Sequence, residues 1–206
     1  MKNVVILGAS GHAKVVAEII IKSGDNVVGF LDDNIKLLSK KVYLDKKVLG
    51  TLANIDKYQD SYFIIGIGNN KIRKDISLKY NNLKWYTAIH PNAIIANDVK
   101  IGEGTAIMPG VVINPGTIIG KHCIINTSSS IDHDNVINDF VHLSPGAHLA
   151  GTVTVGEGTW VCIGASIINN VTIGKNNIIG AGAVVLKDIL ENDKICIGIP
   201  AQIYEK

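Results

Sequence analysis

A six-residue repeat of aliphatic side chains is the feature that most constrains this fold. Counting from Ile89 in steps of six, all seventeen positions up to Val185 hold Ile, Leu or Val, and no insertion breaks the phase. A period of six fits neither the 3.6-residue turn of a helix nor the two-residue alternation of a strand; it is typical of hexapeptide solenoids. We therefore expect a triangular prism of stacked parallel coils, three units to a coil, with the aliphatic side chains inside.

Small and turn-forming residues accompany the repeat. The position two before the aliphatic residue is small or β-branched in most units from Val99 to Ala183, and Asn135 and Asn177 are the exceptions. Gly, Asn or Ala often follows the aliphatic residue, as at Gly102. Because these residues tolerate the backbone of tight corners, we expect the prism to turn there.

The first 85 residues have a different pattern and predict a small α/β domain. The apolar run "NVVIL" before Gly8, the segment "NVVGFLDDN" and the start of "YFIIGIGNNKIRKDISLKY" read as strands. The segment "GHAKVVAEIIIKSG" has helical spacing and stops at Gly24, and the part after the glycine turn "GIGNN" reads as another helix. Strand-helix-strand order indicates a Rossmann-like parallel sheet with helices packed on it. The expected domains are residues 1–85 and 86–206.

Three loops of this front domain should meet at the carboxyl ends of the strands, where open parallel sheets bind ligands. They are Gly8 to His12, Asp32 to Asn34 and Gly66 to Asn70. The glycine-rich turn before a helix suits an anion, and paired aspartates can accept hydrogen bonds from a ribose or a base. The turn is not G-x-G-x-x-G, so we do not expect a dinucleotide site. The three loops together favour a nucleotide-sized ligand.

The residues Asp132, His133 and Asp134 interrupt the repeat with an acid-base-acid cluster. They follow the inward-facing Ile131 and should face outward, so packing does not require them. Acyl transfer from a thioester to an amine needs a base, a polarised carbonyl and close approach. His133 can act as the base, with Asp134 holding its tautomer.

The coil geometry predicts the positions of two further residues, His142 and Gly151. His142 lies half a coil beyond His133 and hence on another side of the prism, so a neighbouring subunit would be needed to bring two such residues together. Gly151 lies eighteen residues after His133 and stacks one coil beyond it. Its bare backbone would admit a thioester, and its N–H is a candidate oxyanion donor.

Composition excludes several classes of function. The chain has 206 residues and a net charge of +2, without a basic stripe interleaved with aromatics, so nucleic acid is not the expected partner. Apolar runs stay below the ~18 residues that a membrane span needs, and the N-terminal run reads as a strand. The isolated Cys123, Cys162 and Cys196 indicate buried reduced thiols and a cytoplasmic protein without a metal site.

The sequence resembles a known family in both halves. The repeat with "VGEGTW", "IGKNNIIGAGAVV" and "KICIGIPA" resembles the left-handed β-helix acyltransferases over roughly residues 88–206. With "ILGASGHAKVV", "LDD" and "GIGN" in front, the chain resembles the bacterial nucleotide-amino-sugar N-acetyltransferases of the UDP-N,N′-diacetylbacillosamine type. The sialic acid O-acetyltransferases belong to the same broad family.

The resemblance implies a homotrimer of left-handed prisms with sites between subunits, acetyl-CoA as co-substrate, and a role in polysaccharide or glycan biosynthesis. It makes His133 the base and Asp134 its partner. The substrate residues, for a nucleotide-linked amino sugar, are Ser10, Gly11, His12, Asp32, Asp33, Gly66, Asn69, Asn126 and Asp132. For acetyl-CoA the candidates are His142, Gly151, Ile163, Gly164, Ala181 and Gly182. Asp stands on both sides of His133 where the family pattern has Glu.

Three alternatives remain open at this point. The acceptor can be a hydroxyl of a sialic acid or another sugar instead of an amine. A zinc enzyme of the γ-carbonic-anhydrase type would use His122, His133, His142 and His148, although their spacings do not match that family. A non-catalytic nucleotide-binding subunit is the third.

Overall fold

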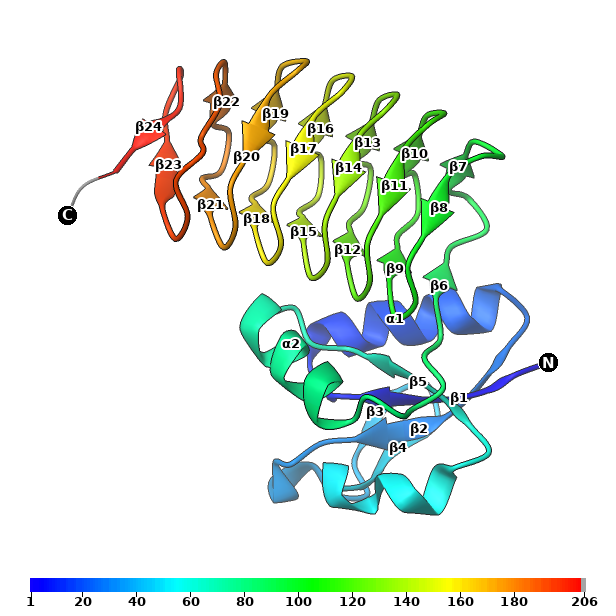
Figure 1. Cartoon of the computed structure of the whole chain (residues 1–206). Coiled ribbons are helices and arrows are strands. Elements are labelled where there is room, and N and C mark those ends of the chain that lie inside the picture. The colour runs from blue at the N-terminus through cyan, green and yellow to red at the C-terminus, as the bar shows by residue number, and fades with distance from the viewer. Residues whose placement is uncertain (205–206) are drawn as a thin grey trace. The chain divides into compact units, whose positions relative to one another are not determined.

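The computed structural model describes residues 1–204 and divides into two compact units, residues 1–91 and the part from Asn92 onward (Figure 1). The first unit holds a five-stranded sheet in the order β3-β4-β2-β1-β5. Its strands are β1 (Asn3–Leu7), β2 (Asn26–Leu31), β3 (Lys41–Tyr43), β4 (Lys46–Gly50) and β5 (Tyr62–Ile65). All neighbours pair in parallel except β3, which is antiparallel to β4 at the edge. The predicted α/β parallel sheet is confirmed.

Two α-helices and two 3-10 helices accompany this sheet: α1 (Gly11–Lys22), α2 (Asn70–Lys79), η1 (Ile35–Leu37) and η2 (Leu52–Tyr58). Helix α1 buries an apolar stripe that includes Val16 and Ile20, and it ends where Gly24 takes a φ of 81°. One core cluster joins Leu7, Leu31 and Phe63 of the sheet to Leu52 and Ile55 of η2. The sequence analysis missed β3, β4 and η2, because they are short and lack a sustained periodicity.

The hexapeptide part is a parallel β-helix of two-residue strands. Their bounds are β6 (Ala88–Ile89), β7 (Ile94–Ile95), β8 (Lys100–Ile101), β9 (Ala106–Ile107), β10 (Val112–Ile113), β11 (Ile118–Ile119), β12 (Ile124–Ile125), β13 (Ser130–Ile131), β14 (Val136–Ile137), β15 (His142–Leu143), β16 (His148–Leu149), β17 (Thr154–Val155), β18 (Trp160–Val161), β19 (Ser166–Ile167), β20 (Thr172–Ile173), β21 (Ile178–Ile179) and β22 (Val184–Val185). Every one of them ends at a position of the six-residue repeat. The tail adds β23 (Ile195–Ile197) and, antiparallel to it, β24 (Gln202–Ile203).

Three sheets form the sides of the prism. The first contains β7-β10-β13-β16-β19-β22, the second β8-β11-β14-β17-β20, and the third runs from β9 through β12, β15, β18 and β21 to β23 and β24. Partners among β7 to β22 stand eighteen residues apart, as in the pair of Ile113 with Ile131. The expectation of three units to a coil is therefore confirmed.

The aliphatic column fills the interior. All fourteen repeat positions from Ile107 to Val185 are at most 2% exposed. The first three, Ile89, Ile95 and Ile101, are partly exposed. Ile89 belongs to the first unit, and the other two lie in the first coil, which has a neighbouring coil on one side only. Cys123 and Cys196 are buried thiols as expected, whereas Cys162 is only half-buried.

The corners of the prism differ from the prediction. Left-handed residues recur every six positions from Gly104 to Gly182, three residues after the aliphatic one and not directly after it. Gly102 does not have a positive φ; a Cβ there would lie 2.5 Å from the carbonyl carbon of Gly120 in the next coil. The glycines that follow the aliphatic residues therefore permit close stacking of coils, and other residues make the turns.

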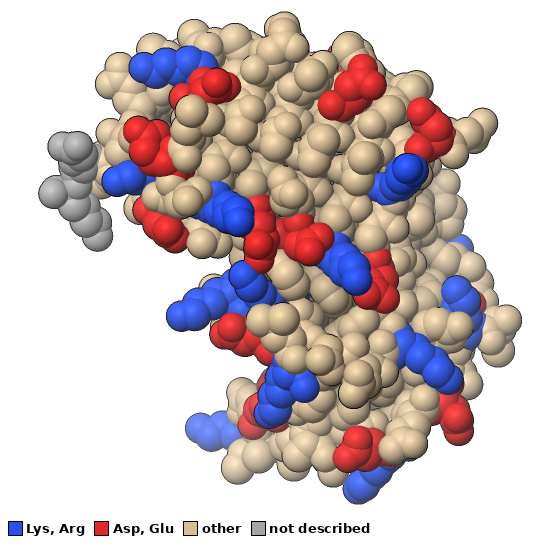
Figure 2. Space-filling view, in the orientation of Figure 1, with Lys and Arg blue, Asp and Glu red and all other residues tan. Residues whose placement is uncertain are grey.

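Charges of both signs are interspersed on the face shown in Figure 2, without a continuous basic stripe. Among residues 1–204, no helix combines the length and the apolar character needed to cross a bilayer.

Candidate active site

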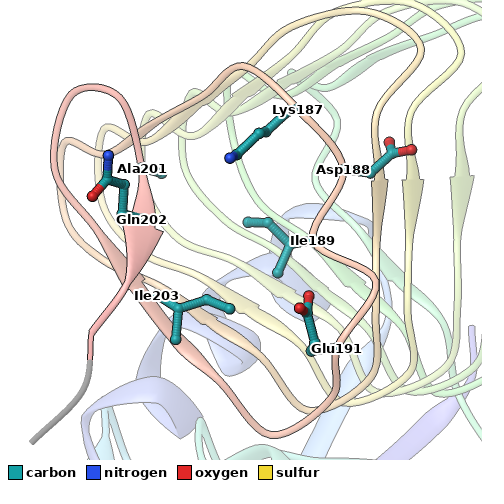
Figure 3. A pocket seen from close by; sticks show the side chains of 7 residues that line it. All are labelled: Lys187, Asp188, Ile189, Glu191, Ala201, Gln202 and Ile203. Carbon is teal, nitrogen blue, oxygen red and sulfur yellow. The ribbon is translucent and has the colours of Figure 1, made fainter.

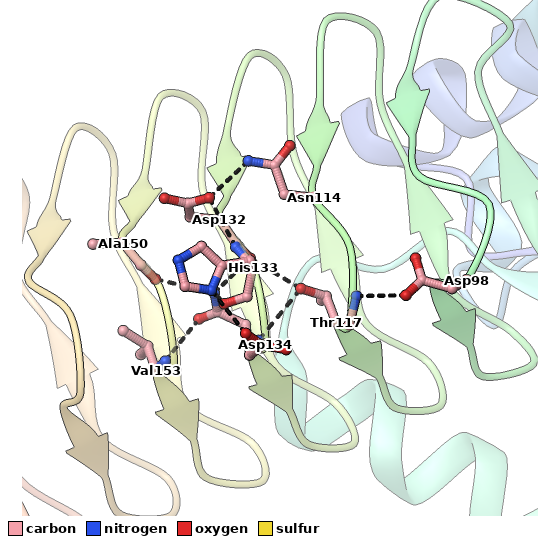
Figure 4. A network of polar contacts seen from close by, with 10 residues as sticks. Asp98, Asn114, Thr117, Asp132, His133, Asp134, Ala150 and Val153 are labelled. Atoms are coloured by element: carbon pink, nitrogen blue, oxygen red, sulfur yellow. Dashed lines mark hydrogen bonds and ion pairs between the residues drawn. The ribbon is translucent and has the colours of Figure 1, made fainter.

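The acid-base-acid cluster forms the corner between β13 and β14 (Figure 4). Nδ1 of His133 lies 2.8 Å from Oδ2 of Asp134, and both side chains are more than half exposed. An ionised carboxylate only accepts hydrogen bonds, so Nδ1 carries the hydrogen and Nε2 of the neutral ring keeps a lone pair. Asp134 has a φ of 58°, which places it at the left-handed position of its turn.

Two carboxylates set the charge of this corner. The hydrogen bond that His133 donates to Asp134 raises the pKa of His133, and the charge of Asp132 adds to the effect. Asp132 itself accepts hydrogen bonds from the side-chain amide of Asn114 at 2.7 Å and from the His133 N–H at 2.8 Å. These two donors lower the pKa of Asp132, so it is held ionised beside the ring. A stronger base results.

A buried asparagine supports the same corner from inside. Asn135 is fully buried, and its amide nitrogen donates to the carbonyls of Asp132, His133 and Ala150 at 2.7, 3.2 and 3.0 Å. Its oxygen accepts from the Val153 N–H at 3.2 Å. The sequence analysis did not assign Asn135 to the site. The signal was present, since Asn135 is one of the two breaks in the column of small residues.

Gly151 lies where the coil geometry predicts, next to the His133 ring. A Cβ at Gly151 would come within 2.6 Å of both Cε1 and Nε2 of that ring. The Thr152 N–H donates to the His133 carbonyl at 2.9 Å and ties the two corners together. Any side chain at position 151 would thus displace the imidazole.

His142 belongs to a second group, on another side of the prism. It lies on β15, and its ring stacks on Trp160 of β18 with centroids 5.7 Å apart and planes 6° apart. Trp160 Nε1 donates to Ser144 Oγ at 2.7 Å, which fixes the indole. Asn126 Nδ2 lies 3.3 Å from His142 Nε2; because the amide nitrogen can only donate, Nε2 accepts this bond.

Apart from Gly151, the other acetyl-CoA candidates lie in the turns that come directly after β18 and β21, two strands of the sheet that contains His142. Gly182 N–H donates to the Ile163 carbonyl at 2.9 Å, so Ile163–Gly164 and Ala181–Gly182 stack in consecutive coils. A Cβ on Gly164 or Gly182 would meet nothing within 4 Å, which leaves an open backbone track.

One flat side of the prism separates the two groups within a single chain. Asn126 lies with His142 and the glycine corner, not with Asp132 and His133, although both Asn126 and Asp132 were expected to contact the sugar. A chain therefore presents the His133 imidazole at one corner and the open backbone of Gly164 and Gly182 at another.

In the first unit, the loops at the carboxyl ends of β1, β2 and β5 meet around one pocket. It has a volume of about 360 Å³ and is lined by Gly8, Asp32, Asp33, Leu52, Ile67, Ile72, Asp75, Ile76, Lys79 and Tyr80. The sequence predicted the loops, which contribute Gly8, Asp32, Asp33 and Ile67, and it named Asp32 and Asp33 as site residues. It missed the lining from η2 and α2, since residues far apart in the chain meet only in the folded unit.

Some of the residues predicted to bind the nucleotide already make hydrogen bonds within the first unit, and others are exposed. The oxygens of Asp32 accept from the N–H groups of Ala9 and Asn34, each at 2.8 Å, and Asp33 Oδ1 accepts from Leu52 N–H at 2.9 Å. Asn69 caps α2 through Ile72 N–H. Gly66 packs tightly against Ile6 and Ala13. Ser10 and Gly11 are exposed at the start of α1. The Ser10 side chain does not cap the helix.

His12 is the second residue of α1, and one of its ring nitrogens is buried. Nε2 has no hydrogen-bond partner, and burial lowers the pKa of His12 to about 4, with the nearby Arg73 charge acting in the same direction. His12 is therefore neutral at physiological pH and can donate to or accept from a ligand.

A cavity of about 400 Å³ lies at the far end of the β-helix, lined by Lys187, Asp188, Ile189, Glu191, Ala201, Gln202 and Ile203 (Figure 3). It contains none of the predicted site residues. Within residues 1–204, no three His, Cys, Asp or Glu side chains are grouped to hold a metal ion.

Comparison with known proteins identifies both halves. Residues 3–80 match the PglD N-terminal domain, and residues 98–133 and 152–187 match the bacterial transferase hexapeptide (six repeats). The structure of a His-to-Asn variant of perosamine N-acetyltransferase from Caulobacter crescentus, with CoA and GDP-perosamine, is 36% identical, with a TM-score of 0.93 over 100% of this chain and 98% of that one. The chain belongs to the PglD-type family of hexapeptide acetyltransferases.

Two other members of the family are similar. The acetyltransferase domain of PglB from Neisseria gonorrhoeae, solved with acetyl coenzyme A, is 32% identical, with a TM-score of 0.92 over 98% of this chain and 99% of that one. The UDP-N-acetylbacillosamine N-acetyltransferase of Bacillus subtilis is 42% identical over 114 residues, which are 52% of this chain. The match likewise spans 52% of that curated relative. The family resemblance that the sequence analysis based on the repeat and on the N-terminal motifs is thus confirmed.

Proposed function

We propose that this protein transfers the acetyl group of acetyl-CoA to the amine of a nucleotide-linked amino-deoxy sugar, with His133 as the general base. The observation that carries the proposal is the His133–Asp134 pair at an open corner, with Nε2 free to accept a proton. The pair lies in a chain whose full length resembles an enzyme crystallised with CoA and GDP-perosamine. The activity fits a cytoplasmic step of glycan biosynthesis.

In the proposed reaction, the amine nitrogen attacks the thioester carbonyl directly. His133 Nε2 takes the proton that nitrogen loses, and Asp134 stabilises the imidazolium. The carbon–sulfur bond breaks as the amide forms, and the departing thiolate takes the proton from the His133 imidazolium, which yields free CoA and restores the neutral base. The bare Cα of Gly151 leaves room for the His133 ring, and the Gly151 N–H is the proposed donor to the carbonyl oxygen.

The front pocket is proposed to hold the nucleotide. Leu52, Ile67 and Ile76 offer apolar walls for a base. The start of α1 at Ser10, Gly11 and His12 offers N–H groups and a buried imidazole nitrogen to the diphosphate. Asp33 keeps its second carboxylate oxygen for a ribose or base donor. Gly66 and Asn69 shape the same loops through packing and capping.

We infer a homotrimer, as in the family that the chain resembles, and the separation of the two groups around the prism supports an assembly that brings them together. The base corner at His133 and the track at Gly164 and Gly182 lie at different corners of one chain. A complete site needs the base corner of one subunit against the glycine corner and His142 of its neighbour. Chains carrying only His133→Gln and chains carrying only Gly182→Trp should regain activity when mixed, because one interface in the mixture is intact.

The deciding experiment is a panel of 3-amino and 4-amino sugars linked to UDP, dTDP and GDP, assayed with acetyl-CoA by release of free thiol. We expect turnover with one amino sugar and a loss of about 10²- to 10⁴-fold in His133→Gln, which is the typical contribution of a general base. Unchanged turnover in His133→Gln would remove the assigned base. Acetylation of the matched hydroxy sugars alone, or of a sialic acid, would establish the O-acetyltransferase alternative.

A further inference from the structure

The segment of residues 35–49, here called the basic hairpin, concentrates the positive charge of the chain. It comprises η1, the edge strand β3, a turn, and most of β4 (Figure 1). It carries Lys36, Lys40, Lys41, Lys46 and Lys47 and a single acid, Asp45, whereas the formal net charge of the whole chain is only +2. This segment plays no part in the candidate active site.

Large apolar side chains lie among these lysines on the surface. Ile35, Leu38, Leu44 and Leu49 are 69%, 43%, 65% and 42% exposed. Leu44 stands in the turn between β3 and β4 with a φ of 51°, a conformation that leucine disfavours and that Gly or Asn adopts readily. An exposed leucine in a strained turn contributes little to folding, so another reason for it must be sought.

The lysines are placed where they repel one another. Lys41 and Lys47 are direct cross-strand partners, and like charges in that position destabilise an antiparallel pair. Lys47 and Leu49 are both exposed on β4, whereas Val48 and Gly50 are buried, so the lysine and the leucine share the open face of this strand. An anionic surface against this face would relieve the repulsion and would cover the leucine at the same time.

Protection of a sheet edge explains only half of this pattern. Lysines on an edge strand hinder pairing with another chain, but exposed leucines beside them favour such contacts. Basic and apolar side chains together suit the interface of an anionic bilayer, where lysines meet headgroup phosphates and apolar groups enter the acyl boundary. Nucleic acid would leave the leucines without partners.

The basic hairpin is also held in place before any binding. The Tyr43 hydroxyl donates to Glu18 of α1, so β3 is tied to the helix. Ser39 N–H donates to the Val48 carbonyl at 2.9 Å, and Val48 N–H donates to the Lys40 carbonyl at 3.0 Å. Leu49 packs over Gly29, where a Cβ would approach its side chain to 2.5 Å. Binding would therefore require little ordering of the backbone.

We propose that the basic hairpin docks the protein peripherally on an anionic phospholipid surface, with Leu44 inserted at the headgroup level and the lysines on the phosphates. The inference is independent of the proposed activity, because none of these residues lies in the base corner, the glycine corner or the front pocket. It assigns the front unit a membrane-facing edge.

Vesicle flotation tests the proposal with the full chain. The protein should float with vesicles of equal parts phosphatidylglycerol and phosphatidylcholine, and not with pure phosphatidylcholine. Lys40→Glu/Lys41→Glu/Lys47→Glu should weaken binding by at least about a hundredfold, since each lysine near an anionic surface contributes roughly fivefold. Leu44→Asn, which suits the left-handed turn, should weaken it about tenfold without lowering the melting temperature.

The controls make equal changes elsewhere in the first unit. Lys57→Glu/Lys71→Glu/Lys84→Glu carries the same charge change on exposed lysines, and Leu78→Asn removes an exposed leucine from α2. Both should bind as the unchanged protein does. Failure of the unchanged protein to float at low salt, or equal losses in the control variants, would overturn the proposal. So would hairpin variants that alter the oligomeric state by light scattering while vesicle binding stays intact, because the occupant would then be another copy of the chain.

Discussion

The imidazole of His133 lies directly against the bare Cα of Gly151 one coil further on, so close that a Cβ would approach Nε2 to 2.6 Å. Gly151→Ala should therefore push the ring away from the direction fixed by Asp134. We expect kcat/KM to fall about 10- to 100-fold, as misplacement by about 1 Å does in other active sites. Thermal unfolding should show that the β-helix persists, and NMR titration of His133 should show a changed pKa. A Gly151→Ala enzyme with full activity would mean that the ring has freedom to move.

The pH profile tests the pairing of His133 with Asp134. Because Asp134 and Asp132 raise the pKa of His133 above the ordinary 6.5 and the base must be deprotonated, kcat/KM should rise with pH through that raised value and then level off. Asp134→Asn keeps a residue that tolerates a φ of 58°. Its profile should rise at lower pH, to a plateau about 10- to 100-fold lower.

Asp98→Asn is the matched control for this profile. Asp98 accepts from the Gly116 N–H at the same edge of the prism but has no contact with the His133 ring among its described hydrogen bonds. It should leave the position of the rise unchanged. If both variants shift the profile equally, a general change in charge explains it, and the assigned partnership is wrong.

The two buried asparagines provide another matched pair. Asn135 holds three carbonyls around the base corner, whereas Asn177 supports the Glu191 carbonyl and the Lys194 N–H. Replacement of either by Thr, the residue at Thr117 and Thr159 in the same columns, should destabilise the fold by about 1–3 kcal/mol. Only Asn135→Thr should also lower kcat, by about tenfold or more at a temperature where both are folded. Equal kcat values would assign Asn135 to stability alone.

His12 should make stability depend on pH. Its folded pKa of about 4 lies below the ordinary 6.5, so between these values the unfolded chain binds the extra proton. The stabilisation from neutral His12 is complete above pH 6.5 and is lost as the pH falls toward 4, to an extent of at most about 3 kcal/mol. In denaturant titrations, His12→Gln should show a smaller loss than the unchanged protein over this window. Parallel curves would indicate that the ring is hydrated when folded.

The sequence by itself determined the β-helix, because a side chain every six residues either fits the prism interior or does not, and the register of each strand follows from that period. It also determined the order of elements in the sheet domain and the stacking of Gly151 on His133, since both follow from spacing along the chain. Nothing comparable marks the short β3 and β4, and the boundary expected between residues 85 and 86 stays a prediction.

Only the tertiary structure decided which polar groups share a site. It put Asn126 beside His142 and one flat side away from His133, and it recruited the buried Asn135 to hold the base corner. It lined the front pocket with η2 and α2, and it showed that Asp32 and Asn69 already serve backbone N–H groups. Hydrogen-bond partners depend on distances between coils and loops that are remote in sequence, and a linear pattern of residue types does not contain those distances.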